Sequence, residues 1–153
     1  FGFIGGIEIT DDHKEIYKAF RDTLEKNNIS FQQKNYFSGD YREKSGYMAA
    51  KILMISEELP EALVCANDNM AIGAIKAFRK NGIRVPEDIA VTGFDDCDVA
   101  EIMGITTVSI PNYERGYIAA QYLIENIQGK MDTEPFKISA KVKWRDSVLN
   151  KKR

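Results

Sequence analysis

Residues 62–94 read ALVCANDNMAIGAIKAFRKNGIRVPEDIAVTGF, and this stretch decides the fold class. It begins with a continuous apolar run, Ala62 to Ala66, which is typical of a strand covered on both faces. Apolar residues then recur at helical spacing from Met70 to Lys80, and Gly82 provides a left-handed stop for that helix. A second apolar run, Ile89 to Phe94, predicts the next buried strand. Strand, helix and strand in this order predict one β–α–β unit of a parallel sheet.

The same alternation of strands and helices continues on both sides of this stretch. Before this stretch we predict a strand over Phe1 to Ile7, a helix from the caps Thr10 to Asp12 as far as Asn27, a strand over Ile29 to Phe37, and a helix from Asp40 with Glu43 completing a capping box. After it we predict a short helix through Ile102, a strand over Thr106 to Ile110, a helix from Pro111 to Gln128, and a last strand over Lys137 to Trp144. We therefore predict an α/β fold with a doubly wound, mainly parallel sheet and helices on both faces.

The composition limits the classes of function. With 153 residues, of which 44% are hydrophobic, the chain can form one α/β domain with a substantial core. A formal net charge of −2 and a pI near 5.5 argue against direct binding of nucleic acid, and the one basic cluster, Lys151 to Arg153, is typical of a frayed tail. No apolar run is long enough to cross a bilayer, and Phe1 to Gly6 lacks the flanks of a signal peptide.

The cysteine, histidine and glycine patterns of the sequence bear on catalysis, metal binding and cofactor binding. Two cysteines, Cys65 and Cys97, do not make a disulfide framework, which favours a reducing cytoplasm. One histidine argues against structural zinc. The sequence shows no nucleophile–base pair and no metal-ligand spacing, and its opening glycines do not form the dinucleotide fingerprint. We therefore expect a protein that is not an enzyme and that holds neither a cofactor nor a metal.

Four motifs in register carry a resemblance to a known family. They are the strand-to-helix junction Ala66 to Ala74, the run Gly82 to Asp96, the segment Thr106 to Val108 with the helix that follows it, and the closing stretch Val142 to Ser147. Together they span nearly the whole chain in the right order. The sequence resembles the C-terminal part of the effector-binding core of transcription regulators of the lactose-repressor/galactose-repressor (LacI/GalR) family, whose fold is periplasmic-binding-protein-like.

The resemblance implies both a function and a division of the chain. An effector, a sugar or another small metabolite, would bind between two subdomains and change their relative angle, and so change the spacing of two DNA headpieces in a homodimer. Residues 1–110 correspond to the C-terminal effector-binding subdomain, 111–130 to a helix that in the family belongs to the N-terminal subdomain, and 131–153 to the closing strand and tail. The headpiece that binds operator DNA, and most of the N-terminal subdomain, would lie outside this chain.

Candidate site residues follow the predicted strands, because ligands of doubly wound sheets lie at the carboxyl ends of the strands. The resemblance places Asn67 and Asp95 against effector hydroxyls, and Tyr41 where relatives stack an aromatic ring on a sugar or a base. Thr10 and Asp12 follow the first predicted strand and form the rim of the expected site. Structural interpretations stay open: Asn67 and the rim residues can act as helix caps, and Tyr41 can be an exposed first-turn residue.

Other polar residues near these positions are expected to be structural. We expect Asp68 to support the fold, Asp96 to cap the short helix that follows it, and His13 to be solvated. Two positions depart from the family pattern, because Ile16 stands where an arginine is common and Ile110 where a glutamine is common. These departures favour a less polar effector, or polar contacts from the absent subdomain.

The resemblance also predicts surfaces for self-association. The expected dimer-interface residues, on the helix from Met70 to Lys80 and on the next short helix, are Met70, Ile72, Ala74, Ile75, Phe78, Val99 and Met103. At helical spacing those of the longer helix cannot all face one core, although packing against the sheet alone is the alternative. A stripe on the helix after Pro111 is a further packing face, formed by Tyr113, Tyr117, Ala120, Leu123 and Ile127. We expect this stripe to pack against a second copy or to fold back onto its own domain.

Two other functions share parts of this pattern. Sugar-binding proteins of transport systems share the fold, but they usually have glycine in place of Asp96, and the segment Arg84 to Asp88 favours the regulator. A receiver domain with Asp95 as phosphoacceptor needs an acidic pair after the first strand and a lysine after the fifth. Ile110 and Pro111 stand in that latter region, which argues against a receiver.

Overall fold

The computed structural model describes residues 1–56, 58–130 and 138–149. The elements in chain order are β1 (Gly2–Gly5), α1 (Asp11–Lys26), the 3-10 turn η1 (Gln33–Asn35), β2 (Tyr36–Ser38), α2 (Glu43–Leu53), β3 (Ala62–Cys65), α3 (Asp68–Lys80), β4 (Ala90–Thr92), α4 (Asp98–Ile102), β5 (Thr107–Ser109), α5 (Asn112–Ile127) and β6 (Lys141–Lys143). The predicted order of strands and helices is confirmed, although Lys137, where the last strand was expected to begin, lies outside the described residues. No helix in these three ranges is long and apolar enough to cross a membrane.

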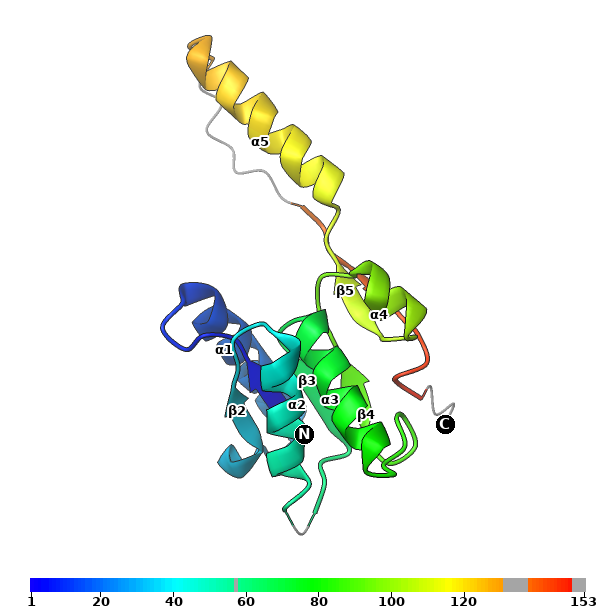
Figure 1. Cartoon of the computed structure of the whole chain (residues 1–153). Helices are drawn as coiled ribbons and strands as arrows, with labels where there is room; N and C mark the ends of the chain where they lie inside the picture. The colour runs from blue at the N-terminus through cyan, green and yellow to red at the C-terminus, as the bar shows by residue number, and fades with distance from the viewer. Residues whose placement is uncertain (57, 131–137, 150–153) are drawn as a thin grey trace.

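A parallel four-stranded sheet forms the centre of the domain, in the order β2-β1-β3-β4 (Figure 1). In its register, Phe3 lies opposite both Tyr36 and Val64. A parallel bridge between Thr92 and Thr106 continues the sheet toward β5, which pairs with β6 in the antiparallel sense. The predicted doubly wound, mainly parallel fold is therefore confirmed. Because the strand order reverses between β1 and β3, the ligand crevice of such a sheet is expected at their carboxyl ends.

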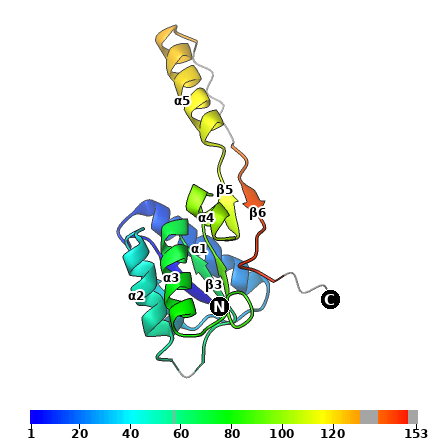
Figure 2. The ribbon, with the colours of Figure 1, turned by 45° about the vertical axis from the view of Figure 1, so that its right-hand side comes forward.

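Helices cover the two faces of the sheet, with α2 and α3 on one side and α1 on the other (Figures 1 and 2). On the α3 side, Met70, Ile75 and Phe78 are completely buried. On the α1 side, the ring of Phe3 packs against Tyr17 and Phe20, with centroid distances of 5.4 and 4.8 Å. These apolar contacts fix the sheet between its helices and so fix its carboxyl edge.

Two glycines allow α2 and α3 to lie unusually close together. A Cβ atom at Gly46 would overlap the backbone carbonyl of Met70, and one at Gly73 would overlap the carbonyl of Glu43. The side chain of Glu43 pairs with Lys76 across the same contact, at 2.8 Å. The close packing explains why α3 is buried on nearly every side.

This packing corrects part of the predicted dimer interface. Met70, Ile72, Ala74, Ile75 and Phe78 are all at most 3% exposed, because α2 covers the area of α3 that the sheet leaves free. The expectation that they offer apolar area to a partner is therefore wrong. Val99 on α4 is 47% exposed, whereas Met103 packs partly against the core.

Three local expectations are also corrected. Helix α2 begins at Glu43 with Arg42 as its N-cap, and no side chain caps it, so the capping box from Asp40 is wrong. The strand expected from Ile29 is confined to β2, because residues 33–35 form the turn η1. His13 is 4% exposed, not solvated, since it lies beneath Gly5 and contacts Tyr36.

Helix α5 projects away from the rest of the domain (Figures 1 and 2). None of its residues is buried, and Tyr113 and Ile127 are 81% and 76% exposed. The expectation that its stripe folds back onto its own domain is wrong. The alternative expectation, contact with a second copy, stays a prediction.

We predict that Gly73→Ala lowers the free energy of unfolding by about 1–3 kcal/mol, because the added methyl group forces α2 and α3 apart. Gly116→Ala is the matched control, since a Cβ at Gly116 on the projecting helix meets nothing within 4 Å. There alanine should raise helix stability by about 1 kcal/mol. Urea unfolding of both variants measures the difference, and equal effects would contradict the close-packing argument.

Candidate functional site

The loops at the carboxyl edge of the sheet contain backbone that L-residues rarely adopt. Tyr41 has φ +64°, Asp95 has φ +108° and Asp96 has φ +58°. Each such position costs about 1–3 kcal/mol and persists only where the surrounding structure holds it, typically at a functional site. These three residues lie in the loops after β2 and β4, on the edge where a ligand is expected.

Asn67 directly follows β3 and is the N-cap of α3. Its Oδ1 accepts the backbone N–H of Met70 at 3.0 Å, and its Nδ2 donates to the carbonyl of Tyr41 at 2.9 Å. The amide therefore joins the loop after β2 to the start of α3. One amide hydrogen and one lone pair are left for a ligand, so the cap and an effector contact are compatible.

Tyr41 is not an exposed first-turn residue, because it precedes α2 and is half-buried. Its ring lies directly over Gly6, where any Cβ would overlap it, and it packs against the edge of the core. The ring thus forms part of the floor between the ends of β1 and β2. An aromatic ring in this place offers a flat apolar face.

Asp95 presents an exposed carboxylate at the end of β4. Its backbone N–H donates to Val108 at 3.0 Å, which ties the residue to β5. Partial burial and the charge of Asp68 raise the pKa of the Asp95 carboxyl above its usual value, against the opposing charge of Arg115. The fold therefore holds this carboxylate in a conformation and an environment that a hydrogen-bonding ligand would improve.

Asp96 does not cap α4, as had been expected, because the N-cap is Cys97 and no side chain caps that helix. Instead its carboxylate pairs with Arg145 at 2.6 Å, and both side chains are largely buried. Burial disfavours the charged form of Asp96, but hydrogen bonds from Arg145 and Ser109 and nearby positive charges outweigh it, so the pKa lies below its usual value. The pair forms at neutral pH and is lost as the pH falls through that lowered pKa.

Asp68 is structural, in agreement with the sequence. Its side chain is almost completely buried; Oδ1 accepts the hydroxyl of Thr107 at 2.6 Å and Oδ2 accepts the N–H of Cys97 at 2.8 Å. One carboxylate therefore joins the start of α3 to β5 and to the loop before α4. This bridge fixes the position of the loop between β4 and α4 that contains Asp95 (the Asp95 loop).

The rim after β1 contains a hydrogen-bonded group, formed by His13, Tyr36 and Glu8, that the sequence did not reveal. Thr10 caps α1, with its hydroxyl accepting the N–H of His13 at 3.3 Å, whereas Asp12 is exposed. His13 Nε2 lies 3.1 Å from the hydroxyl of Tyr36, which donates to Glu8 at 2.9 Å. Burial and Glu8 raise the pKa of Tyr36 to about 12, so its hydroxyl stays protonated. This chain of contacts places Glu8 on the rim.

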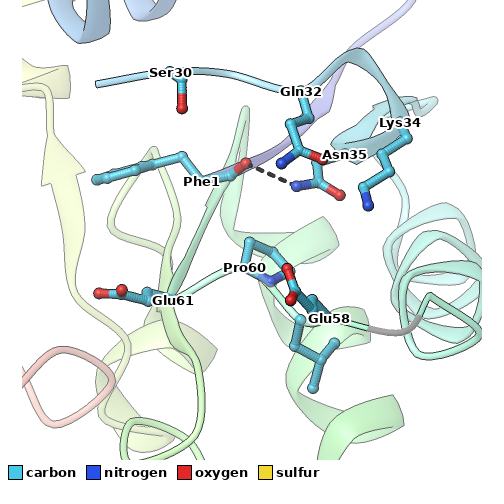
Figure 3. A pocket seen from close by; sticks show the side chains of 9 residues that line it. Phe1, Ser30, Gln32, Lys34, Asn35, Glu58, Pro60 and Glu61 are labelled. Carbon is cyan, nitrogen blue, oxygen red and sulfur yellow. Dashed lines mark hydrogen bonds between the residues drawn. The ribbon is translucent and has the colours of Figure 1, made fainter. Parts of the chain in front are cut away.

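A polar pocket at the other end of the sheet is distinct from this edge. It has a volume of about 250 Å³ and lies where Phe1, Asn35 and Pro60 precede β1, β2 and β3 (Figure 3). The amide of Asn35 donates to the carbonyl of Phe1 at 3.3 Å (Figure 3). Since ligands of parallel sheets bind at the carboxyl ends, the candidate site is the edge near Asn67 and Asp95.

Known proteins resemble this chain over most of its length. The family model of the periplasmic binding protein-like domain matches residues 1–148. The lactose operon repressor of Rhizobium radiobacter is 37% identical over 107 residues, which are 69% of this chain and 95% of that protein. The chain belongs to the LacI/GalR family.

Two further relatives show how much of a family member the chain represents. The helix-turn-helix-type repressor PurR of Aliivibrio fischeri is 36% identical over 143 residues, which cover 90% of this chain and 42% of PurR. The crystal structure of the Escherichia coli repressor AscG superposes with a TM-score of 0.89 at 31% identity, over 97% of this chain and 55% of AscG. The chain spans about half the length of these two LacI/GalR repressors.

We predict that Asp95→Gly raises the free energy of unfolding at pH 7 by about 1 kcal/mol, because glycine removes the strain at φ +108° and the partly buried charge. The gain should shrink as the pH falls below the carboxylate range, since a protonated Asp95 has no charge to desolvate. Asp96→Asn is the control and should destabilise at pH 7, because it leaves Arg145 without a charged partner while the backbone strain at φ +58° stays. Urea titrations at pH 7 and pH 3 measure both, and a destabilised Asp95→Gly would contradict the strain argument.

Proposed function

We propose that this chain is the C-terminal part of the effector-binding core of a ligand-gated transcription repressor. The observation that carries the proposal is the strained, exposed carboxylate of Asp95 on the same sheet edge as the cap amide of Asn67, where the Asp68 N–H donates to the Phe94 carbonyl at 2.8 Å, in a chain whose relatives are transcription repressors. A carboxylate accepts two hydroxyl groups, and an amide both donates and accepts. The effector is therefore a small hydroxylated metabolite such as a sugar, held also by the ring of Tyr41 and the rim residues Thr10 and Asp12.

The missing polar groups have a consequence for the effector. Ile16 and Ile110 are both half-buried and supply no hydrogen-bonding side chain. The remaining polar contacts come from the N-terminal subdomain, which closes over the effector from the other side. Binding favours the closed arrangement because only that arrangement contacts the effector with both subdomains.

Helix α5 is the part of this chain that belongs to the N-terminal subdomain. The support is its complete exposure, together with the length of relatives that continue well beyond the matched region. Fully exposing a large apolar side chain forfeits about 1.5–3 kcal/mol, so several of them on one helix require a cover. In the isolated chain a second copy supplies that cover.

The regulator acts as a homodimer in the cytoplasm and binds operator DNA through a helix-turn-helix headpiece. With α3 buried, the dimer contact of this part falls on α4, where Val99 is exposed. The relative PurR is a helix-turn-helix-type repressor, which supports the headpiece. Effector binding changes the angle between subdomains and hence the spacing of two headpieces.

In the full-length regulator, Asn67→Ala and Asp95→Ala should each weaken effector binding by about 1–3 kcal/mol, since each leaves effector groups unpaired. Titration calorimetry with the sugar that changes the affinity of the regulator for its operator measures this. Asn67→Ser separates contact from cap, because serine also caps helices well but lacks the amide donor. Asp22→Ala, at an exposed position on α1, is the matched control. Unchanged affinity in both alanine variants, with folding retained, would remove these residues from the site.

The chain by itself should not bind DNA with sequence selectivity, because it carries a net charge of −2 and no headpiece. The full-length protein should bind its operator, and effector should change that affinity. Mobility-shift assays compare the two proteins. Salt-resistant, sequence-selective binding by the isolated chain would contradict the proposed division of functions.

A further inference from the structure

The ion pair between Asp96 and Arg145 joins the Asp95 loop to the chain that returns from β6. The guanidinium of Arg145 donates to Asp96 Oδ1 at 2.6 Å and to the carbonyl of Ile105 at 3.0 Å. The two paired side chains are 17% and 16% exposed. A forked guanidinium with two acceptors has one orientation, which a lysine ammonium would not impose. The Asp95 loop is therefore held to the segment after β6 at a fixed angle.

Arg145 itself is fixed from both sides along its own backbone. The Thr106 hydroxyl accepts the N–H of Arg145 at 2.9 Å and lies 3.1 Å from its carbonyl oxygen. Two residues on, the hydroxyl of Ser147 donates to the carbonyl of Val91 at 2.6 Å and accepts the N–H of Thr106 at 2.8 Å. The segment 145–147 is thus attached to β4 and to the start of β5.

The two strands beyond this attachment are the connections to α5. Strand β5 leads into α5 and β6 follows it, and they pair through Thr107 to Ser109 and Lys141 to Lys143 (Figure 2). Since no residue of α5 is buried, the direction of α5 relative to the sheet is set by these strands. Asp68 holds Thr107 at the base of β5 in the same way that Asp96 holds Arg145 beyond β6.

We propose that Arg145 is a positioning residue that couples the Asp95 loop to the direction of α5. The proposal deepens the proposed function and rests on it, because Asp95 is there the effector ligand and α5 belongs to the moving subdomain. An effector held by Asp95 shifts or stiffens the backbone of Asp95 and Asp96. The ion pair passes this constraint to the segment after β6, and the pairing of β6 with β5 passes it to α5. Arg145 and Asp96 act through other residues and do not touch the effector.

The coupling is tested on this chain without effector or DNA, at a concentration at which light scattering shows a monomer, so that no second copy covers α5. Residual dipolar couplings of backbone amides report the order of α5 relative to the sheet. Hydrogen exchange of the Asp95 amide, which is bonded to Val108, reports the loop. In Arg145→Met, which keeps an unbranched apolar stem but removes the guanidinium and its charge, we expect α5 couplings to fall relative to those of β1 and β3. The Asp95 amide should exchange about tenfold faster, while amides of β1 and β3 keep their rates.

Three variants make the result decisive. Asp96→Asn breaks the same ion pair from the other side and should give the same pattern, which covers the case in which Arg145→Met does not fold. Arg145→Lys keeps the charge and should restore part of the order of α5. Arg84→Met breaks the exposed pair of Arg84 and Asp88 and should change neither readout.

Two outcomes would overturn the proposal. One is unchanged α5 couplings and unchanged Asp95 exchange in both charge-removing variants. The other is a uniform rise in exchange across all strands, which shows a purely structural ion pair. Both are distinguishable from failure of the proposed function, which is tested separately by effector affinity in the Asn67 and Asp95 variants.

Discussion

The buried carboxylate of Asp68 is the contact on which the carboxyl edge of the sheet depends. It accepts hydrogen bonds from the Thr107 hydroxyl and the Cys97 backbone, and so it joins α3, β5 and the loop before α4. A buried carboxylate is tolerated only when donors replace its lost water, and removing either donor leaves part of a charge unpaired. Asp68 sits where the first turn of α3 also favours a negative charge. Because α3 is itself wedged against α2 through Gly46 and Gly73, this carboxylate has a rigid base.

The rigid base allows strain to persist nearby. Asp95 and Asp96 both adopt left-handed backbone, which isolated chains avoid, and both belong to the loop that Asp68 fixes at Cys97. One of the two carboxylates is satisfied inside the protein by Arg145, whereas the other is exposed and electrostatically unfavourable. Two neighbouring acids of the same type thus take different roles because one points toward a cation and the other toward solvent. This asymmetry is the reason we propose a ligand contact for Asp95 and a structural role for Asp96.

Local patterns were enough to predict most of the fold. Apolar runs such as Ala62 to Ala66, the cap Asn67 and the stop at Gly82 act within a few residues, so the order of elements follows from the sequence. The partner of Asp96 could not be predicted, because Arg145 lies 49 residues away and no local pattern links them. His13 was misjudged for the same reason, since its burial depends on Tyr36 and on the missing side chain of Gly5. The burial of α3 depends on how closely α2 approaches it. The spacing of apolar residues along one helix does not predict the distance to its neighbour. Whether Asn67 and Asp95 contact an effector is a property of the ligand-bound regulator, and it stays a prediction.

The exposed helix α5 and the ordered edge of the sheet are consequences of one arrangement of the chain. The chain leaves the domain through β5 and returns through β6; β5 is hydrogen-bonded to Asp95 through Val108, and β6 is joined to β5 by their antiparallel pairing. If α5 were packed on its own domain, its apolar stripe would hold it and the two strands would transmit nothing. Because α5 is exposed in the single chain, two things can set its direction: the protein surface that covers its apolar stripe, and the proposed ligand at the carboxyl edge of the sheet. If the proposed effector binds at Asp95, this connection links its binding to the position of the second subdomain without any contact between the two.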